Sequence, residues 1–287
     1  MGYTIFFLLL SFVTSDPILD YSELGWVDTC KGKKNSPIDI PKQVTNTSDF
    51  IKIVSKSYPL LKGVNWEILN SKEFYLNLTS LNGYLMIMKN NTNYKYLLDS
   101  IKLHIPSEHS IQGQKYDVEI QIFHTKDAIW LTNSGVVTDP DLNYKYLAIS
   151  VFFKSGSNDT NQIMTGFDFS NFGNQLSGVD ISIFADSSSN FFHYEGSQTT
   201  PNCDENVNWI ILENIQNHTK TQNDIVSSIV KKIYPYGNAR SQKNLNTRTV
   251  YYLDMSSASD NLNFSMIILA MAVMFLIFFF RKKFDII

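Results

Sequence analysis

The sequence lacks several signals that mark common classes of enzyme and binding protein. It has no glycine-rich phosphate-binding loop, no nucleic-acid-binding motif, no internal repeat and no arrangement typical of a catalytic serine or cysteine. Only 18% of its 287 residues are charged, and the formal net charge is −3. A general attraction to polyanions is therefore not expected. The 44% hydrophobic content is enough to bury one large core, so we expect one main domain.

Long apolar runs occur only at the two ends of the chain. Residues 1–15 hold an apolar run of about ten residues followed by small and polar ones, which predicts a cleaved secretory signal peptide. Residues 264–280 carry no charge and are just long enough to cross a bilayer as a helix. The basic residues that open the tail, 281–287, favour the cytoplasmic side. We therefore predict a single-pass type I membrane protein of the cell surface or a secretory-pathway membrane.

This topology places residues 16–255 outside the cytoplasm as one ectodomain, joined to the span by a polar stalk, 256–263. The alternative is that residues 264–280 form a buried core helix, although such a helix is seldom apolar all round. Outside the tail there are 21 basic and 26 acidic residues, a net charge of −5. Sequons that fit a secretory route are found at Asn46, Asn77, Asn90, Asn158 and Asn217.

Cysteine is scarce, with only Cys30 and Cys203 in the chain. Both fall in the segment assigned to an oxidising compartment, and two cysteines can form only one intramolecular pair. In the chain-entropy model, closing a loop of about 170 residues stabilises the fold by roughly 5 kcal/mol.

Short strands dominate the expected secondary structure. Apolar and β-branched runs are separated by Gly, Asn, Asp or Pro, which predicts a mainly β domain. The runs are WEILN, EFYLNLTS, YLMIMK, SIKLHI, DVEIQIFH, AIWLTN, YLAISVFFK, VNWIILEN and RTVYYLD. Residues 221–234 instead predict a helix, because Ile225, Ile229 and Ile233 recur every four residues.

Four blocks of the sequence resemble the α-class, or eukaryotic-type, carbonic anhydrase family, in the family's order. They are KNSPIDI at 34–40, IPSEHSIQGQKYDVEIQIFH at 105–124, YEGSQTTPNCDENVNW at 194–209 and GNARSQKNLNTR at 237–248. The resemblance implies that family's fold: a large, twisted, mostly antiparallel ten-stranded sheet with few short helices. It also implies the Cys30–Cys203 disulfide of the secreted members.

The zinc-ligand positions of the family are changed in this chain. Where the family has His-x-His, the sequence has Lys102 and His104, and where the family has Glu-x-His it has Glu119 and Gln121. The resemblance thus leaves one of three imidazoles, His104, together with the outer-shell carboxylate Glu119. Catalytic zinc needs about three protein ligands, and an ammonium at the first position would repel the dication. We expect no metal cofactor, unless zinc binds an altered site.

The hydrogen-bonding frame of the family's pocket is retained. Thr199 and Glu108 match the pair that orients zinc-bound hydroxide in active relatives, and Thr200 lines the same wall. Gln198 stands where the family has a leucine directly before Thr199. The proton-shuttle histidine is absent, since Glu73 or a neighbour stands at its place.

A lysine inside this pocket needs a counter-ion. We expect Lys102 to pair with Glu119 or Glu108, because a carboxylate left without its metal would otherwise be buried alone. The alternative is that Lys102 lies on the surface.

The four other histidines do not rebuild the metal site. His124 should lie on the opposite strand face from Gln121, and the resemblance makes His109 a structural partner of Tyr194. We expect His193 to be structural or exposed, and His218, inside a sequon, to be on the surface. The basic residues near the C-terminal end are expected to form an ordinary solvated cluster: Lys231, Lys232, Arg240, Lys243 and Arg248.

Three functions remain open. The first is a catalytically inactive carbonic anhydrase-like ectodomain with a binding or adhesion role toward a protein or glycan partner. The second is an active zinc carbonic anhydrase, hydrating carbon dioxide at an altered metal site. The third is a structural subunit of a membrane protein assembly. No nucleic-acid partner is expected.

Overall fold

The structure is a computed structural model that describes residues 20–46, 51–69, 73–135 and 141–254. The predicted signal peptide, stalk, membrane helix and tail lie outside these residues. Within the described ranges, no helix is long and apolar enough to cross a membrane.

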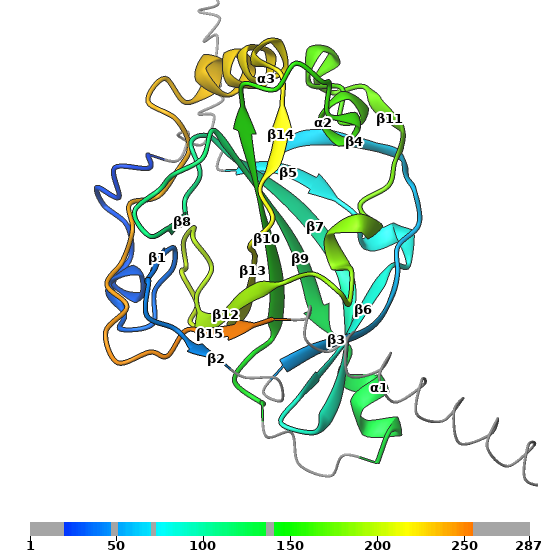
Figure 1. The fold of residues 1–287 in the computed structure, drawn as a ribbon, viewed down its shortest axis with the longest axis vertical. Helices are drawn as coiled ribbons and strands as arrows, with labels where there is room; N and C mark the ends of the chain where they lie inside the picture. Colours follow the sequence, from blue (N-terminus) through cyan, green and yellow to red (C-terminus); the bar gives the residue numbers. More distant parts are fainter. Residues whose placement is uncertain (1–19, 47–50, 70–72, 136–140, 255–287) are drawn as a thin grey trace, which may run out of the picture.

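One mixed sheet of thirteen strands dominates the described part of the chain (Figure 1). Most neighbouring strands run antiparallel, whereas the β10–β13, β10–β14 and β15–β2 pairs are parallel. Ten strands form its main path, in the order β11 (Gln175–Val179), β4 (Leu61–Leu69), β5 (Glu73–Asn77), β7 (Thr92–His104), β9 (Val118–Lys126), β10 (Tyr146–Ser155), β13 (Val207–Leu212), β12 (Phe191–Gly196), β15 (Tyr251–Leu253) and β2 (Thr45–Asn46).

Three strands lie off this path. They are β3 (Ile51–Ser57), β6 (Tyr84–Lys89) and β14 (Gln216–His218). The predicted mainly β fold with a large, twisted, mostly antiparallel sheet is confirmed. The described sheet exceeds the expected ten strands because β6 adds to β7, β3 adds to β6, and β14 adds to β10. A separate two-stranded parallel sheet joins β1 (Asp39–Ile40) to β8 (Ser110–Ile111).

Within the described residues, helices are few and short, as expected. The α-helices are α1 (Ala128–Asn133), α2 (Gln162–Gly166) and α3 (Lys220–Ile233). The 3-10 helices are η1 (Asp28–Lys31), η2 (Thr79–Leu81), η3 (Phe169–Asn171) and η4 (Ser182–Ala185).

The strand predicted over AIWLTN is wrong, because these residues form α1. Asp127 caps the helix by accepting a hydrogen bond from the Trp130 backbone N–H at 2.9 Å. Leu131 turns into the core, while Ile129 is 76% exposed. A run of six residues carries too little periodicity to separate one helical turn from a strand, and the cap decides it here.

The helix predicted near residues 221–234 is confirmed as α3, with a capping box between Thr219 and Gln222 at its start. Val226 and Val230 are fully buried, Ile229 and Ile233 are partly buried against the main core, and Ile225 is exposed. The valines share the four-residue spacing of the isoleucines, so periodicity alone could not show which residues are buried most deeply.

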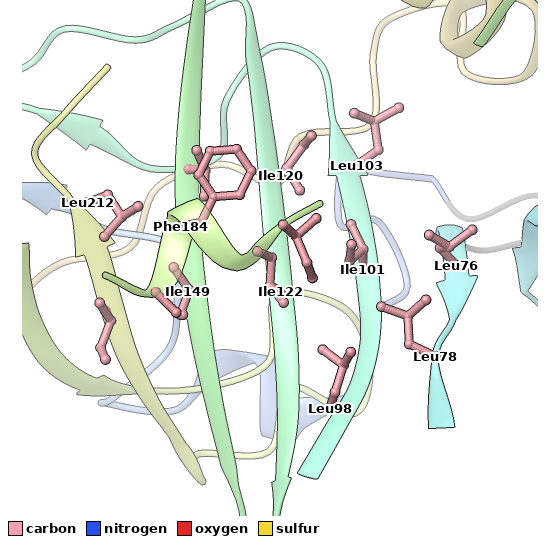
Figure 2. Packing of buried hydrophobic residues seen from close by; sticks show 14 of the residues in the cluster. Leu76, Leu78, Leu98, Ile101, Leu103, Ile120, Ile122, Ile149, Phe184 and Leu212 are labelled. Atoms are coloured by element: carbon pink, nitrogen blue, oxygen red, sulfur yellow. The ribbon is translucent and has the colours of Figure 1, made fainter. Parts of the chain in front are cut away.

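The main core lies on one face of the sheet. Leu76, Ile101, Ile122 and Ile149 form a continuous row of cross-strand neighbours across β5, β7, β9 and β10. All four are fully buried, and Figure 2 shows them beside Leu103, Ile120 and Phe184 of the same cluster. Because strand side chains alternate, the residues between them point to the opposite face. That face carries the family's pocket positions.

The disulfide between Cys30 and Cys203 is present, as predicted. It joins η1 to the segment that follows β12, 173 residues later in the chain. That segment carries Thr199 and Thr200, so the disulfide helps to hold the wall of the pocket against the N-terminal part of the domain.

All five histidines of the chain are buried. His193 is structural, since its Nδ1 lies 2.9 Å from the Trp209 carbonyl oxygen. His124 lies on the face opposite Gln121, as predicted, and its Nε2 is 2.6 Å from the Tyr58 hydroxyl. The expected surface position of His218 is wrong, because it is fully buried in β14 and packs edge-on against Phe153 of β10. Its sequon neighbour Asn217 is exposed, which shows that alternation along β14 separates the two.

Burial of histidine predicts a loss of stability in mild acid. Burial lowers the pKa of His124 to about 4 and that of His193 to about 3. The unfolded chain, with histidine pKa values near 6.5, binds more protons below that pH, so stability is full above pH 6.5 and falls toward pH 4. Urea unfolding should give a free energy lower by roughly 2–4 kcal/mol at pH 5 than at pH 7.

The variants His124→Gln and His193→Gln should each remove about half of this pH dependence, whatever their effect on absolute stability. Most carboxylates stay ionised above pH 5 and add little to the difference. An unfolding free energy that is constant from pH 7 to pH 5 would contradict the account.

Candidate functional site

The candidate site lies on the sheet face opposite the main core, where β5, β7 and β9 run side by side. The strand register pairs Tyr75 with Lys102, Lys102 with Gln121, and His104 with Glu119. The positions expected from the sequence to correspond to zinc ligands therefore do come together. Period-two alternation, together with these registers, is enough to bring them there.

Lys102 forms a buried ion pair with Glu73 of β5. Its Nζ lies 3.0 Å from Glu73 Oε1 and 4.6 Å from the centre of the Phe123 ring, and both charged side chains are 8% exposed. Glu73 also accepts a hydrogen bond from the Thr200 hydroxyl. Burial alone would raise the pKa of Glu73, but Lys102 and Thr200 hold it below its usual value. The carboxylate thus stays ionised beside the ammonium.

The partner predicted for Lys102, Glu119 or Glu108, is wrong, and so is the alternative of a surface lysine. Glu73 takes that role, 29 residues earlier in the chain. The physical reason is that the two expected carboxylates already have donors of their own, as described next.

Glu119 is saturated with hydrogen bonds. Its Oε2 accepts from the backbone N–H groups of Glu108 and His109, at 2.7 and 2.9 Å. Its Oε1 lies 2.7 Å from His109 Nδ1 and also accepts from Ser150 and Gln121. Burial would raise the pKa of Glu119, but His109 outweighs it and lowers the value to about 2. The carboxylate is a fixed anion behind the site.

Gln121 joins the two carboxylates through its amide nitrogen. The Nε2 group donates to Glu108 Oε2 at 2.8 Å and to Glu119 Oε1 at 3.0 Å. The second oxygen of Glu108 accepts from the backbone N–H of Arg240 at 2.9 Å. The amide oxygen of Gln121 is buried and has no hydrogen-bond partner among the described residues.

His104 keeps the orientation of a metal ligand. Its Nδ1 lies 2.8 Å from the Asn238 carbonyl oxygen, which can only accept, so Nδ1 carries the proton and Nε2 holds a lone pair. That Nε2 is buried without a hydrogen-bond partner in the described part of the chain. Tyr21, which sequence reasoning did not single out, lies edge-on to the imidazole at 6.3 Å.

The wall formed by the segment after β12 is only partly the expected frame. Thr199 is buried, but its hydroxyl has no partner within the described ranges and is not bonded to Glu108. Thr200 is bonded to Glu73 instead. Gln198 is half-buried and lines the adjoining cavity. The expected pairing of Thr199 with Glu108 is therefore not made here.

The remaining residues of the family blocks act as structural supports. His109 bridges Glu119 and Tyr194, with its Nε2 2.6 Å from the Tyr194 oxygen. This agrees with the structural role expected for it. Arg240, expected in a solvated cluster, is fully buried and donates to carbonyl oxygens of Cys30 and Ser36.

Other members of that expected cluster are also engaged. Lys243 lies 2.5 Å from Glu23, and Arg248 donates to the carbonyl oxygens of Leu245, Lys34 and Asn244. Lys231 and Lys232 are exposed in the last turn of α3. A single solvated basic patch is therefore wrong, because Arg240 and Arg248 are used to hold backbone segments together.

A cavity of about 270 Å³ opens beside the ion pair. It is lined by Tyr75 of β5, Phe123 of β9 and Tyr146 of β10, with Gln198 from the facing wall. The three aromatic residues were not identified from the sequence. Two of them could have been: Tyr75 shares the parity of Glu73 on its strand, and Phe123 that of Gln121.

The donor set does not fit catalytic zinc. The site offers one imidazole nitrogen, from His104, and one amide oxygen, from Gln121, and the third position holds an ammonium paired with Glu73. Zinc in catalytic sites takes about three His, Asp, Glu or Cys ligands. Among the described residues, no group of three or more such side chains is arranged to hold a metal ion.

The comparison with protein families decides the relationship. The eukaryotic-type carbonic anhydrase model matches residues 22–254, nearly the whole described domain. The chain belongs to the eukaryotic-type carbonic anhydrase family. Members of this family are typically zinc-dependent, so the changed donor set is a departure within the family.

Individual relatives agree with this membership. Carbonic anhydrase Nec1 from Nesocodon mauritianus is 29% identical over 248 residues, covering 81% of this chain and 83% of its own. Carbonic anhydrase 4 from Rattus norvegicus is 28% identical over 236 residues, covering 73% and 69%. The structure of an α-carbonic anhydrase from Photobacterium profundum superimposes with a TM-score of 0.59 at 20% identity, over 80% of this chain and 94% of that one.

The ion pair predicts an asymmetric response to substitution. Lys102→Met leaves Glu73 buried without its cation and should lower the free energy of unfolding by about 3–5 kcal/mol. The double variant Lys102→Met/Glu73→Gln keeps an acceptor for Thr200 and should recover most of that loss. Urea unfolding of the two variants measures the difference.

Lys220 and Asp224 provide the matched control, since they form an exposed pair 2.7 Å apart with side chains 80% and 59% exposed. Lys220→Met should change stability by less than about 1 kcal/mol. Equal losses in the single and the double variant at Lys102 would mean that the pair is not what stabilises the site.

Proposed function

We propose that this protein is a carbonic anhydrase family member that does not hydrate carbon dioxide and acts as a binding or adhesion domain. The observation that carries the proposal is the Lys102–Glu73 ion pair, with Nζ and Oε1 3.0 Å apart where the family has a zinc ligand. The ammonium would repel a dication at this position. Displacing it would leave the Glu73 carboxylate buried without its cation, at a cost of several kcal/mol.

The arrangement around Gln121 supports the same proposal. Its amide nitrogen is held by Glu108 and Glu119, and its oxygen, a weak zinc donor, is buried without a partner among the described residues. A water bound to one imidazole and one amide would not be acidified to near neutrality as in a three-ligand zinc site. Without such a nucleophile, Thr199 has no hydroxide to orient.

A second candidate, an active enzyme with an altered metal site, is favoured by one observation. The lone pair of His104 Nε2 and the Thr199 hydroxyl are both buried without a partner among the described residues. Zinc bound there would need Lys102 to lose its proton and leave Glu73. The two candidates make opposite predictions for metal content.

The purified protein should contain less than about 0.1 zinc per chain and show no carbon dioxide hydration. The double variant Lys102→His/Gln121→His restores the family's three imidazoles, with His104 Nε2 already oriented by Asn238, and should bind zinc orders of magnitude more tightly. Zinc content by elemental analysis and stopped-flow hydration measure both. Activity should return only partly, because Gln198 and the absent proton shuttle remain, and outer-shell partners are worth about 10- to 100-fold.

Lys102→Met/Gln121→Leu is the control, since it removes the same side chains without adding ligands and should bind no zinc. Stoichiometric zinc in the native protein, or none in the double-histidine variant, would overturn the proposal.

We further propose that the domain faces the outside of a membrane, anchored by residues 264–280 after loss of residues 1–15. In support, the side chains of all five candidate glycosylation sites are exposed, as expected for sequons that can be modified: Asn46, Asn77, Asn90, Asn158 and Asn217. Whether the domain also serves as a structural subunit of an assembly stays a prediction from the sequence.

Protease added to intact cells should remove the domain and spare residues 281–287 carrying an added epitope. Treatment with an N-glycanase should give the intact protein a sharper band of higher electrophoretic mobility. The variant Asn158→Gln, in an exposed bend, should reduce the shift without altering folding. A domain protected from external protease would reverse the proposed orientation.

A further inference from the structure

The cavity beside the ion pair has the size and lining of a small-ligand site. Its volume of about 270 Å³ is just below the range of about 300–1,000 Å³ typical of drug-sized pockets. Four neighbouring strands and the facing wall contribute the side chains that matter here: Tyr75, Asp99, Lys102, Phe123, Tyr146 and Gln198. The cavity is therefore large enough for one small ring rather than for an extended chain.

Charge in the cavity argues against an anionic ligand. Lys102 is neutralised by Glu73, and the Asp99 carboxylate accepts hydrogen bonds only from hydroxyls in the described part of the chain, Ser100 at 2.8 Å and Thr125 at 3.3 Å. The lining thus has a net charge of −1. A sulfate or carboxylate group would meet two carboxylates and one cation that is already paired.

Charge does not make the cavity a cation site either, because lysines already occupy its aromatic rings. Lys102 lies over Phe123 at 4.6 Å from the ring centre, and Lys145 lies over Tyr146 at 5.0 Å. A ligand ammonium would approach two ammonium groups in order to reach these rings. The half-buried ring of Tyr75 has no such partner among the described residues.

The polar groups that remain are mixed donors and acceptors. Lys102 has three N–H donors and uses one on Glu73. The Gln198 side chain has no hydrogen bond to any described residue and offers both a donor and an acceptor, while Asp99 offers acceptors. A bound anion needs only hydrogen-bond donors from the protein, and a bound ammonium needs only acceptors. The hydroxyl groups of a ligand use both kinds of protein group. This inventory, next to the apolar face of the half-buried Tyr75 ring, matches a sugar ring with hydroxyls at its edge and C–H groups on its face.

We infer that this cavity binds one neutral pyranose ring, either a free monosaccharide or the end of a glycan. The inference rests on the proposed function, because the paired lysine would not line the cavity if zinc occupied the site. Of the two kinds of partner predicted from the sequence, a protein or a glycan, this inference selects the glycan.

The test is saturation-transfer difference NMR on the full-length protein with uncharged sugars: galactose, glucose, mannose and N-acetylglucosamine. Each is offered free and as its methyl glycoside, and N-acetylglucosamine 6-sulfate is the charged comparison. At least one uncharged sugar should show saturable binding, and the sulfated sugar should bind no more tightly. If the methyl glycoside binds as tightly as the free sugar, the ligand is the end of a glycan. If only the free sugar binds, the ligand is a free monosaccharide. Either result supports sugar binding in this cavity.

Three variants place the binding in the cavity. Asp99→Asn, Gln198→Leu and Tyr75→Leu should each lower the affinity for the sugar by about tenfold, which is roughly the contribution of one hydrogen bond or ring contact. Asp159→Asn and Tyr236→Ala change exposed residues outside the cavity and should leave the affinity unchanged. Three variants with different surroundings keep the test valid if one of them fails to fold.

The inference is overturned if no uncharged sugar binds, if none of the three cavity variants weakens binding, or if the sulfated sugar or tetramethylammonium binds more tightly than every uncharged one. Zinc is measured on the same samples. A zinc-free protein without sugar binding contradicts only this inference, whereas a zinc-loaded protein contradicts the proposed function.

Discussion

The contact between the Lys102 ammonium and the Glu73 carboxylate determines what this pocket can do. Two charges 3.0 Å apart and almost fully buried stabilise each other only while both remain. The pair fixes β5 against β7, and through Thr200 it fixes both to the segment after β12. In the family, the cation in this pocket is typically a bound zinc ion, whereas here it is the Lys102 ammonium.

The surroundings of the pair explain how the fold tolerates the change. Glu119 and Glu108 are anions suited to support histidine ligands, yet they keep full sets of donors: backbone N–H groups, His109, Ser150 and the Gln121 amide. Gln121 thus keeps hydrogen bonds to both carboxylates while it offers an amide where the family has an imidazole. The same residue preserves the packing behind the site and changes the donors inside the pocket.

Much of this could be predicted from the sequence, because the four family blocks fix strand order and register. Alternation then places Lys102, His104 and Gln121 on one face. The partner of Lys102 could not be predicted, since Glu73 comes from a different strand and its approach depends on tertiary packing. Nor could α1, whose cap outweighs a strand-like run, or the full burial of Val226 and Val230 in α3, which share their spacing with the partly buried isoleucines. Buried His218 and Arg240 show the same limit: local sequence indicates polarity but not burial.

The most direct test of the central claim is a crystal structure of the protein grown with zinc in excess, with anomalous data collected at the zinc absorption edge. The account predicts no anomalous peak near His104 Nε2, and Lys102 Nζ within ion-pair distance of Glu73. A zinc peak bonded to His104, with Lys102 turned away from Glu73, would contradict it.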